Sequence, residues 1–408
     1  MSRGRILFVN RFYYPDHSAT AQILTDLAEA LASRGWTVCV IASQLRYDDP
    51  ASKLKARDSR AGVEIHRVPT TRFGRSGLAG RAIDYLSFYI MAFFATLAMA
   101  RRGDTVVAKT DPPLLSVVMA VATGLRGVRL VNWLQDLYPE VAAELGVSVM
   151  RGPAGAVLRR LRNASLHRAI LNVAIGERMS ERLLAEGAPP AQVRVMHNWA
   201  DDDAIRPVAT SGLKLRNEWG LRDAFVIGYS GNLGRAHEAD TVLGAARLLG
   251  EGANIVFLMI GNGRESERLE ARVAADGLSA CFQFRPYQPR EQLSESLGVA
   301  DIHWLSLRPE LEGLIVPSKF YGIAAAGRAV IALSHHEGEI GRLVTREDCG
   351  VVIAPGDSVR MAEVIKVLAG DPARVAAMGI AARAMIDRDY GRRAAFDRWD
   401  RLFTEIDA

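Results

Sequence analysis

The stretch GLIVPSKFYGIAAAGRAVIAL, residues 313–333, decides the fold of the second half of this chain. Its pattern predicts a loop that ends at Ser318 and Lys319, a short helix of small and apolar residues at 320–326, and a buried strand at Ala329–Leu333. The alanines allow the helix to lie close to a sheet, so packing accounts for them. Packing does not account for a serine and a lysine at the start of the helix, and we expect this loop to hold an anionic group.

Strands and helices alternate in the same way over residues 1–200. Apolar residues at helical spacing predict a helix at Ala19–Arg34, which Gly35 ends. Apolar runs predict strands at Ile6–Val9, Val38–Ala42, Val63–Val68, Thr105–Lys109 and Arg129–Trp133, with helices between them. Such alternation predicts a parallel sheet covered by helices on both faces.

The pattern breaks into polar and turn residues around Val195–Ala204 and then begins again. In the second half we predict strands at 225–229, 255–260, 282–284, 302–305 and 329–333, helices at 240–249, 264–276 and 290–297, and a helical segment at 372–406. A chain of 408 residues is too long for one ordinary core. We therefore expect an α/β protein of two doubly wound, Rossmann-like domains, at 1–200 and 207–385, that face each other across a cleft.

The composition indicates a globular and mildly basic protein, with 49% hydrophobic residues and a formal charge of +5. This charge suits anionic small molecules or an anionic lipid surface, and without a nucleic-acid-binding motif we expect no nucleic acid partner. Cys39, Cys281 and Cys349 have no metal-binding spacing and suggest no disulfide framework, which favours a reducing cytoplasm. The run Ile6–Val9 is too short for a signal-peptide core.

Two segments raise the question of a membrane surface. The apolar segment Ile83–Ala100 falls short of the roughly 20 uninterrupted apolar residues of a membrane span, so it is either a core helix or an interfacial helix. It is flanked by Arg75, Arg81, Arg101 and Arg102. A basic run, LRRLRNASLHRAIL at 158–171, either forms a solvated helix face or meets anionic head groups through Arg159, Arg160, Arg162 and Arg168.

Ligands of doubly wound sheets bind beyond the carboxyl ends of the strands, so the residues after each strand are informative. After the strand at 225–229, Gly231 and Gly234 allow close backbone approach, and Arg235 and His237 precede a helix. Backbone N–H groups and a guanidinium predict a phosphate site here, although a solvated turn gives the same pattern.

Two further turns of the second half are candidates for the same cleft. The turn GNGRES begins with Gly261 directly after a predicted strand. In RPYQP, Pro286 and Tyr287 could flank a flat nucleobase, and a surface turn is the alternative.

The first half offers fewer candidates. NRFYYPDHSATAQ, residues 10–22, lacks the GxGxxG of a dinucleotide-binding turn. Within it, Asp16, Ser18 and Thr20 either cap the following helix or meet a ligand. Asp136 follows the strand at 129–133, where a carboxylate could accept a hydroxyl proton, and the alternative is that Asp136 or Glu140 caps a helix.

The order and spacing of five motifs carry a family resemblance over essentially the whole chain. They are RFYYPD at 11–16, QDLYPE at 135–140, HNWAD at 197–201, YSGNLGRAH at 229–237 and VPSKFYGIAAAGR at 316–328. Together they resemble the retaining GT-B glycosyltransferases of family 4. The nearest type is similar to the bacterial O-antigen and colanic-acid enzymes that transfer fucose or N-acetylfucosamine.

The resemblance implies a donor, a UDP- or GDP-sugar, on the C-terminal domain, an acceptor on the N-terminal domain, and a C-terminal helix at 386–408 that returns to the N-terminal domain. It implies that protein cations and a helix N-terminus neutralise the diphosphate without a metal ion or other cofactor. The DDD run at 201–203 falls in the predicted linker and is not expected to bind metal. We assign the diphosphate to Lys319 and Arg235, and acceptor positioning to Asp136. The other residues expected to bind substrate are Ser18, Gly231, Asn232, His237, Gly261, Pro286, Tyr287, Glu312 and Ser318.

The chain departs from the family pattern in two places. Asn232 and His237 stand where many relatives carry an arginine and a lysine, and Leu314 and Gly322 stand where many carry two glutamates. Glu310 or Glu312 is expected to replace the first glutamate. For the second, which holds ribose in relatives, either Glu312 reaches in or backbone groups alone hold the ribose.

The expected function is transfer of a sugar from a nucleotide-diphosphate sugar to a polyprenyl-diphosphate-linked saccharide during cell-surface polysaccharide synthesis, with retention of configuration. The expected location is the cytoplasm, peripheral on the cytoplasmic face of the inner membrane. Two alternatives stay open: a sugar-nucleotide 2-epimerase of the same fold, and a non-catalytic partner that binds nucleotide sugars in a polysaccharide assembly.

Overall fold

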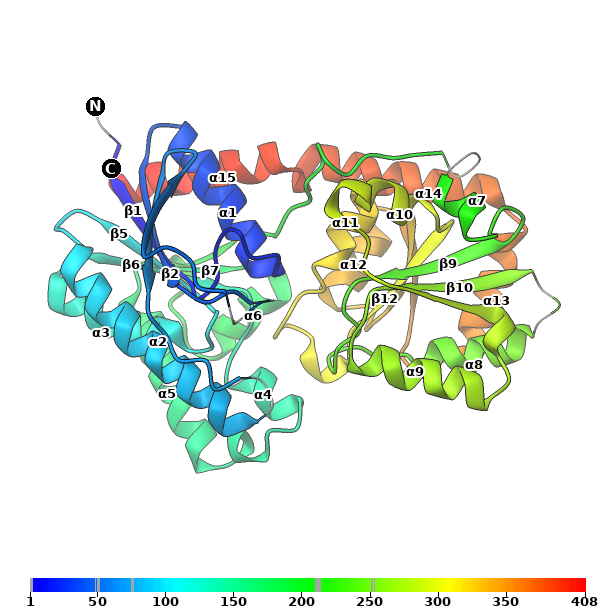
Figure 1. Ribbon diagram of the computed structural model, residues 1–408, viewed down its shortest axis with the longest axis horizontal. Coiled ribbons are helices and arrows are strands. Elements are labelled where there is room, and N and C mark those ends of the chain that lie inside the picture. The colour runs from blue at the N-terminus through cyan, green and yellow to red at the C-terminus, as the bar shows by residue number, and fades with distance from the viewer. Residues whose placement is uncertain are drawn as a thin grey trace. The chain divides into compact units, whose positions relative to one another are not determined.

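The computed structural model describes residues 3–47, 49, 52–74, 77–209, 214–250, 252 and 254–408. Arg75, one of the arginines expected beside the apolar segment, lies outside the described residues. The chain divides into two compact units, which we call the first unit (Met1–His197 with Phe396–Ala408) and the second unit (Asn198–Ala395). Each unit contains its own sheet with helices packed around it (Figure 1).

The sheet of the first unit has the strand order β3-β4-β2-β1-β5-β6-β7-β8. Its strands are β1 (Arg5–Val9), β2 (Thr37–Ser43), β3 (Arg57–Arg60), β4 (Val63–Val68), β5 (Thr105–Lys109), β6 (Arg129–Leu134), β7 (Leu171–Ala174) and β8 (Val193–Val195). The sheet is parallel, as predicted, except at its edge, where β3 pairs antiparallel with β4. All of β3 (RDSR) is exposed, so it offers no apolar pattern from which a strand could be predicted.

Helices cover both faces of this sheet. Side chains alternate between the two faces along each strand, so each strand contacts helices on both sides. The helices are α1 (Ala19–Ser33), α2 (Leu78–Met99), α3 (Leu115–Arg126), α4 (Glu140–Glu144), α5 (Pro153–Arg168), α6 (Glu177–Ala185) and the part of α15 (Arg392–Asp407) from Phe396 onward. Leu7 and Val9 of β1 pack in one apolar cluster with α2 and α3. Phe8 points the other way and contacts Phe403 of α15, with ring centroids 6.2 Å apart.

The second unit has a six-stranded sheet with the order β11-β10-β9-β12-β13-β14, and all its pairings are parallel. Its strands are β9 (Phe225–Ser230), β10 (Ile255–Ile260), β11 (Phe282–Arg285), β12 (Ile302–Ser306), β13 (Ala329–Leu333) and β14 (Gly350–Ile353). Its helices are α7 (Lys214–Glu218), α8 (Asp240–Leu249), α9 (Arg264–Ala275), α10 (Leu293–Gly298), α11 (Lys319–Ala325), α12 (Glu339–Arg346), α13 (Ser358–Ala369) and α14 (Pro372–Met385).

Two predictions for this unit need correction. The helical segment expected at 372–406 is not continuous, because a π-helical turn at Ile386–Tyr390 separates α14 from α15. The helix expected at 290–297 is a 3-10 turn at Arg290–Gln292 followed by α10.

The strand order fixes where ligands can bind in the second unit. β9 lies between β10 and β12, so the chain leaves β9 toward one side of the sheet and later returns to the other side. At such a switch point the loops beyond the carboxyl ends of neighbouring strands diverge and leave room for a ligand.

Candidate functional site

The loops after β9 and β12 bring a lysine and a histidine together at the carboxyl end of the second sheet. Lys319 is the first residue of α11, and His237 lies in the loop between β9 and α8. The Nζ atom of Lys319 lies 3.0 Å from Nε2 of His237 and 5.3 Å from the centroid of the Tyr229 ring. Two candidates from separate motifs of the sequence therefore form one cluster.

The hydrogen bonds of His237 define its tautomer. Burial and the nearby charge of Lys319 lower the pKa of His237 to about 4, so the ring is neutral at pH 7. Its Nδ1 atom lies 2.6 Å from the carbonyl oxygen of Ser306, to which only a protonated Nδ1 can donate. Nε2 is then the acceptor for the Lys319 ammonium. His237 orients the lysine and adds no charge of its own.

Lys319 is a partly buried cation that is held by neutral groups. Burial lowers its pKa to about 8. Among the described residues no carboxylate forms an ion pair with it, and its neighbours are a neutral imidazole and an aromatic ring. A cation with little water around it and no paired acid is stabilised strongly by an incoming anion.

Two glycines make room for this arrangement. Gly231 has φ +126°, and a Cβ there would lie 2.7 Å from Cε of Lys319. Gly261 has φ +125°, and a Cβ there would lie 2.5 Å from the carbonyl oxygen of Gly231. Both positions require glycine, because the backbone conformation is unfavourable for other residues and a side chain would collide. The loops after β9 and β10 can thus stack while the lysine stem passes beside them.

The other residues predicted for this site lie around the same loops. Tyr287 is 51% exposed, and its ring approaches Gly261, where a Cβ would meet it at 3.2 Å. Pro286 is exposed beside it, and Asn232 is exposed next to Gly231. Ser318 is the N-cap of α11, and its hydroxyl makes no capping hydrogen bond. These positions leave a ring face, an amide and a hydroxyl near the lysine.

Arg235 lies on the same loop as His237 but is exposed. The described residues offer its guanidinium no partner. Lys319 thus lies inside the cluster and Arg235 lies on its surface. The arginine can reach a ligand, but its guanidinium forms no hydrogen bond or ion pair with a described residue.

Glu312 and Gly322 are the positions where the sequence departs from the family pattern. Oε2 of Glu312 accepts a hydrogen bond of 3.3 Å from the backbone N–H of Glu339, the first residue of α12. This carboxylate lies at a helix N-terminus, where a negative charge is stabilised. A Cβ on Gly322 would meet only Ile205 Cδ1, at 3.9 Å, so packing does not require glycine there. The contact of Glu312 with ribose stays a prediction.

In the first unit, Asp136 belongs to a group of charges beyond β5 and β6. Burial and the nearby Asp111 raise the pKa of Asp136 to about 6, although Lys109 acts in the opposite direction. Burial lowers the pKa of Lys109 to about 7. The Lys109 Nζ donates to the carbonyl oxygen of Thr20 at 2.6 Å and lies 4.1 Å from the centroid of the Trp133 ring. A carboxyl group that titrates near neutral pH is suited to accept a hydroxyl proton.

Ser18 caps a helix in this structure, and its contact with a ligand stays a prediction. It is the N-cap of α1, and its Oγ accepts a hydrogen bond of 3.4 Å from the backbone N–H of Ala21. Asp16, from the same turn, is buried and accepts from the backbone N–H of Tyr47 at 2.6 Å. Both groups stabilise the segment that follows β1.

Sequence reasoning missed Lys109, Tyr229 and Ser306. Lys109 is the last residue of the fully buried strand TVVAK, and a lysine in that position was the only available signal. Tyr229 and Ser306 are strand residues. The Tyr229 ring contacts Lys319, and the Ser306 carbonyl oxygen contacts His237. No sequence pattern predicts such contacts.

Two groups of potential metal ligands can be judged from their partners. Asp201, from the DDD run, forms ion pairs with Arg290 at 2.9 Å and Arg392 at 2.7 Å. Cys39, Glu64 and His66 offer ligand atoms within 4.8 Å of one another on neighbouring strands. Burial raises the pKa of the Cys39 thiol to about 12, so a metal would have to displace a tightly held proton.

Comparisons with known proteins agree with this architecture. Residues 18–199 match the family described as glycosyl transferase 4-like domain, and residues 213–385 match glycosyl transferases group 1. A probable glycosyltransferase of Pseudomonas aeruginosa, WbjE, is 26% identical over 333 residues, which are 80% of this chain and 81% of the relative.

Two solved structures show the same fold. The Anabaena protein Alr3699/HepE in complex with UDP superimposes with a TM-score of 0.73 at 16% identity, over 98% of this chain and 100% of that one. WaaG, a glycosyltransferase involved in lipopolysaccharide biosynthesis, gives a TM-score of 0.71 at 16% identity, over 98% and 99% of the two chains. The two family matches, the two parallel-stranded Rossmann-like units and these relatives lead to one conclusion: the chain belongs to the GT-B glycosyltransferases.

Proposed function

We propose that this glycosyltransferase uses a UDP- or GDP-sugar and transfers the sugar, with retention of configuration, to a polyprenyl-diphosphate-linked saccharide of a cell-surface polysaccharide. The observation that carries the donor assignment is Lys319, a partly buried ammonium that neutral groups orient and no described carboxylate neutralises. A nucleoside diphosphate supplies the missing negative charge. The complex of Alr3699/HepE with UDP supports the same class of ligand.

The proposed transfer depends on stabilising the leaving diphosphate. The bond between the anomeric carbon and the β-phosphate oxygen breaks while the acceptor hydroxyl oxygen bonds to that carbon from the same face. Lys319, with Arg235 and backbone amides near Gly231 and Ser318, stabilises the charge that develops on the phosphate. The hydroxyl proton passes to the departing phosphate. Asp136 orients the acceptor, and the proposed reaction continues in the presence of EDTA.

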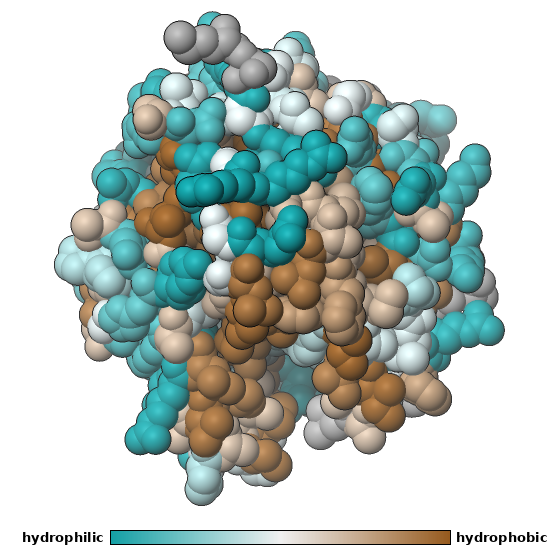
Figure 2. Space-filling view, turned by 90° about the vertical axis from the view of Figure 1, so that its left-hand side faces the viewer, coloured by the Kyte–Doolittle hydropathy of each residue, from teal (hydrophilic) through white to brown (hydrophobic). Residues whose placement is uncertain are grey.

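An apolar surface of the first unit supports the lipid-linked acceptor. α2 packs against α3, and α3 packs against α5. The outer row of α2 is exposed and apolar: Leu86 is 56% exposed and Phe94 is 60% exposed, and Leu125 of α3 is 69% exposed. Figure 2 shows apolar side chains gathered in ridges over one face, with hydrophilic side chains beside them. Exposed apolar area of this extent marks an interaction surface.

We infer that this surface lies on the cytoplasmic face of the membrane as a peripheral contact. By length and composition alone, Ala79–Met99 could cross a membrane, and only 22% of its apolar window is buried. The opposite side of α2, however, packs Phe88 and Ala92 into the core of the first unit. The helix therefore belongs to the folded unit, and a shallow contact with lipid suits its exposed side.

One part of the predicted basic surface needs correction. Arg162 cannot meet head groups, because its side chain is only 2% exposed and lies 2.7 Å from Glu140 and 3.6 Å from Glu186. Its sequence neighbours Arg160 and Arg168 are exposed. The residues of this helix that are available to anionic lipid are therefore fewer than the sequence suggested.

A ligand panel followed by an activity assay tests the proposal. Thermal unfolding is measured with UDP, GDP, TDP and ADP, and one uridine or guanosine diphosphate is expected to stabilise the protein by mass action. The matching sugar nucleotide is then incubated with and without a farnesyl-diphosphate-linked saccharide, and the anomeric configuration of the product is read by NMR. Retained configuration in an acceptor-dependent product supports the proposal. A 2-epimer formed without acceptor, or binding without turnover, contradicts it.

A further inference from the structure

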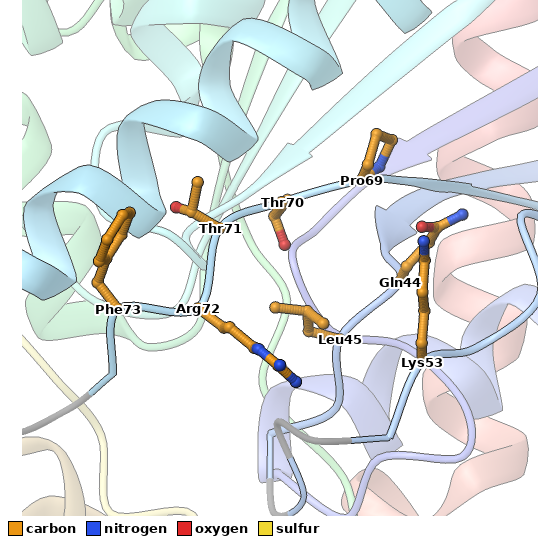
Figure 3. Close-up of a pocket in the computed structure, with 8 residues that line it drawn as sticks. All are labelled: Gln44, Leu45, Lys53, Pro69, Thr70, Thr71, Arg72 and Phe73. Atoms are coloured by element: carbon orange, nitrogen blue, oxygen red, sulfur yellow. The ribbon is translucent and has the colours of Figure 1, made fainter.

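A pocket lies in the first unit, at the carboxyl ends of β2 and β4. A pocket of about 520 Å³ opens there, and its lining includes Gln44, Leu45, Lys53, Arg72 and Phe73. Lys53 and Gln44 stand on one side of the view in Figure 3, Arg72 and Phe73 on the other, and Leu45 between them. Two cationic side chains from separate segments thus line one hollow.

The backbone around Lys53 is fixed to the segment that follows β2. Lys53 forms an isolated antiparallel bridge with Leu45, and the backbone N–H of Leu54 donates to the carbonyl oxygen of Gln44 at 2.8 Å. These contacts hold the lysine at the pocket rather than on a free loop.

The backbone around Arg72 is fixed by a buried carboxylate on α2. Asp84 is 5% exposed. One of its oxygens accepts from Thr71 Oγ1 at 2.8 Å and from the backbone N–H of Phe73 at 2.9 Å, and the other accepts from the N–H of Gly74 at 3.3 Å. The residues on both sides of Arg72 are therefore anchored, and the arginine is presented to the pocket by a preorganised turn.

Neither cation is neutralised by a residue that the structure describes. Lys53 and Arg72 are exposed, and neither forms an ion pair with a described residue. The nearest carboxylate of the turn, Asp84, is directed at backbone N–H groups and lies 3.8 Å from the guanidinium of Arg11 instead. An anion with several oxygens offers hydrogen-bond acceptors for both cations.

A smaller pocket of about 230 Å³ adjoins this one and shares Leu45 with it. Its lining includes Arg11, Tyr85 and Asp111. The Arg11 guanidinium lies 5.3 Å from the centroid of the Tyr85 ring. Aromatic faces beside charged hydrogen-bonding groups are the combination that suits a sugar ring, which has both apolar C–H faces and hydroxyl edges.

We propose that Lys53 and Arg72 bind the diphosphate of the acceptor, and that the adjoining pocket at Tyr85 and Asp111 takes the sugar attached to it. The identity of the ligand as an acceptor rests on the proposed function, whereas the binding of a diphosphate at this pocket does not. The site lies in the first unit, and the donor cluster at Lys319 lies in the second.

Direct binding tests this site without any turnover. Affinity for inorganic pyrophosphate is measured by titration calorimetry with saturating UDP, which occupies the donor site, and then for farnesyl diphosphate and glucose 1-phosphate. The pocket variant is Lys53→Ala/Arg72→Ala. The matched control is Lys55→Ala/Arg57→Ala, which removes the same charge from exposed neighbouring positions that do not line the pocket.

Each cation removed from the pocket is expected to weaken pyrophosphate binding roughly tenfold, and the control variant is expected to bind within about twofold of the parent protein. Farnesyl diphosphate should lose the same factor, and glucose 1-phosphate should bind more weakly than either diphosphate. Equal affinity in the pocket variant, or equal loss in the control, overturns the site. Loss for pyrophosphate but not for farnesyl diphosphate overturns its assignment to the acceptor. Failure of UDP to bind counts against the proposed function alone, because pyrophosphate can then be titrated without it.

Discussion

A methyl group on Gly231 would lie 2.7 Å from Cε of Lys319, so the path of the lysine depends on the absence of a side chain at position 231. Gly231→Ala is therefore expected to displace Lys319 from His237 and to lower kcat/KM by about tenfold or more. Steady-state kinetics with the donor identified by the ligand panel measures the effect. Gly250→Ala is the control, since Gly250 also has a positive φ, +68°, but a Cβ there meets nothing within 4 Å. Equal activity of the two variants would show that the lysine does not need this path.

The pH dependence of activity follows from the buried position of Lys319. Burial lowers its pKa to about 8, so the ammonium of the free enzyme is lost as the pH rises through that value. The ratio kcat/KM is expected to fall above pH about 8, because it reports the free enzyme. Arginine stays charged over this pH range. Whatever activity the Lys319→Arg variant keeps, its kcat/KM should therefore not fall above pH about 8. A kcat/KM that is flat to pH 9.5 in the parent enzyme contradicts the assignment.

The titration of Lys319 should also change the free energy of unfolding, which is expected to rise with pH while kcat/KM falls. The unfolded lysine titrates near 10.4 and the folded one near 8, so between these values the unfolded state binds more protons. The contribution of Lys319 to the free energy of unfolding therefore rises with pH in that window while activity falls. Comparison of the parent with Lys319→Met by chemical denaturation at pH 7.5 and 9.5 isolates this contribution.

The ion pair of Arg162 and Glu140 is expected to be structural. Glu140→Ala leaves a buried guanidinium whose remaining described carboxylate partner is Glu186, at 3.6 Å, and should cost about 3 kcal/mol of the free energy of unfolding. Glu144→Ala, in the same helix, breaks an exposed pair with Arg151 and should cost less than about 1 kcal/mol. Hydrogen exchange of the amides in α5 reports the local unfolding of this unit. Similar exchange rates in the two variants would contradict a special role for the buried pair.

The exposed row of α2 should govern binding to lipid. Leu86→Glu/Phe94→Glu is expected to abolish flotation with vesicles of anionic and zwitterionic lipid, because it places two charges on the apolar surface. Val359→Glu/Val367→Glu alters exposed apolar residues of α13 in the second unit and should leave flotation unchanged. If both variants float like the parent protein, or if the parent protein does not float at low salt, the peripheral contact is contradicted.

The sequence predicted the elements that have a strong apolar signal and missed those without one. β1, β5 and β13 are buried along most or all of their length, and their apolar runs mark them. β3 is a polar edge strand that exists only because β4 offers it hydrogen bonds, so no pattern in its own residues could predict it. β7, β8 and β14 were not predicted either; all three are short, and β8 and β14 are only partly buried.

The sequence named Lys319 and His237 as separate candidates but did not predict their contact. Lys319 and His237 each follow a strand, which made both candidates. Their contact depends on β9 and β12 being neighbours in the sheet, and neither motif predicts that these strands pair. Arg162 illustrates the opposite failure, because a basic helical run looks solvated until its packing partners, Glu140 and Glu186, are known.

The transfer rate of Lys319→Ala shows whether Lys319 stabilises the departing diphosphate. With the identified donor saturating, kcat is expected to fall by about 10²–10³, the usual loss when a group that stabilises transition-state charge is removed. The unfolding temperature without ligand should stay close to that of the parent, and Lys366→Ala, at an exposed position of α13, should keep full activity. A purified, folded Lys319→Ala protein that transfers sugar at the parent rate would contradict the claim.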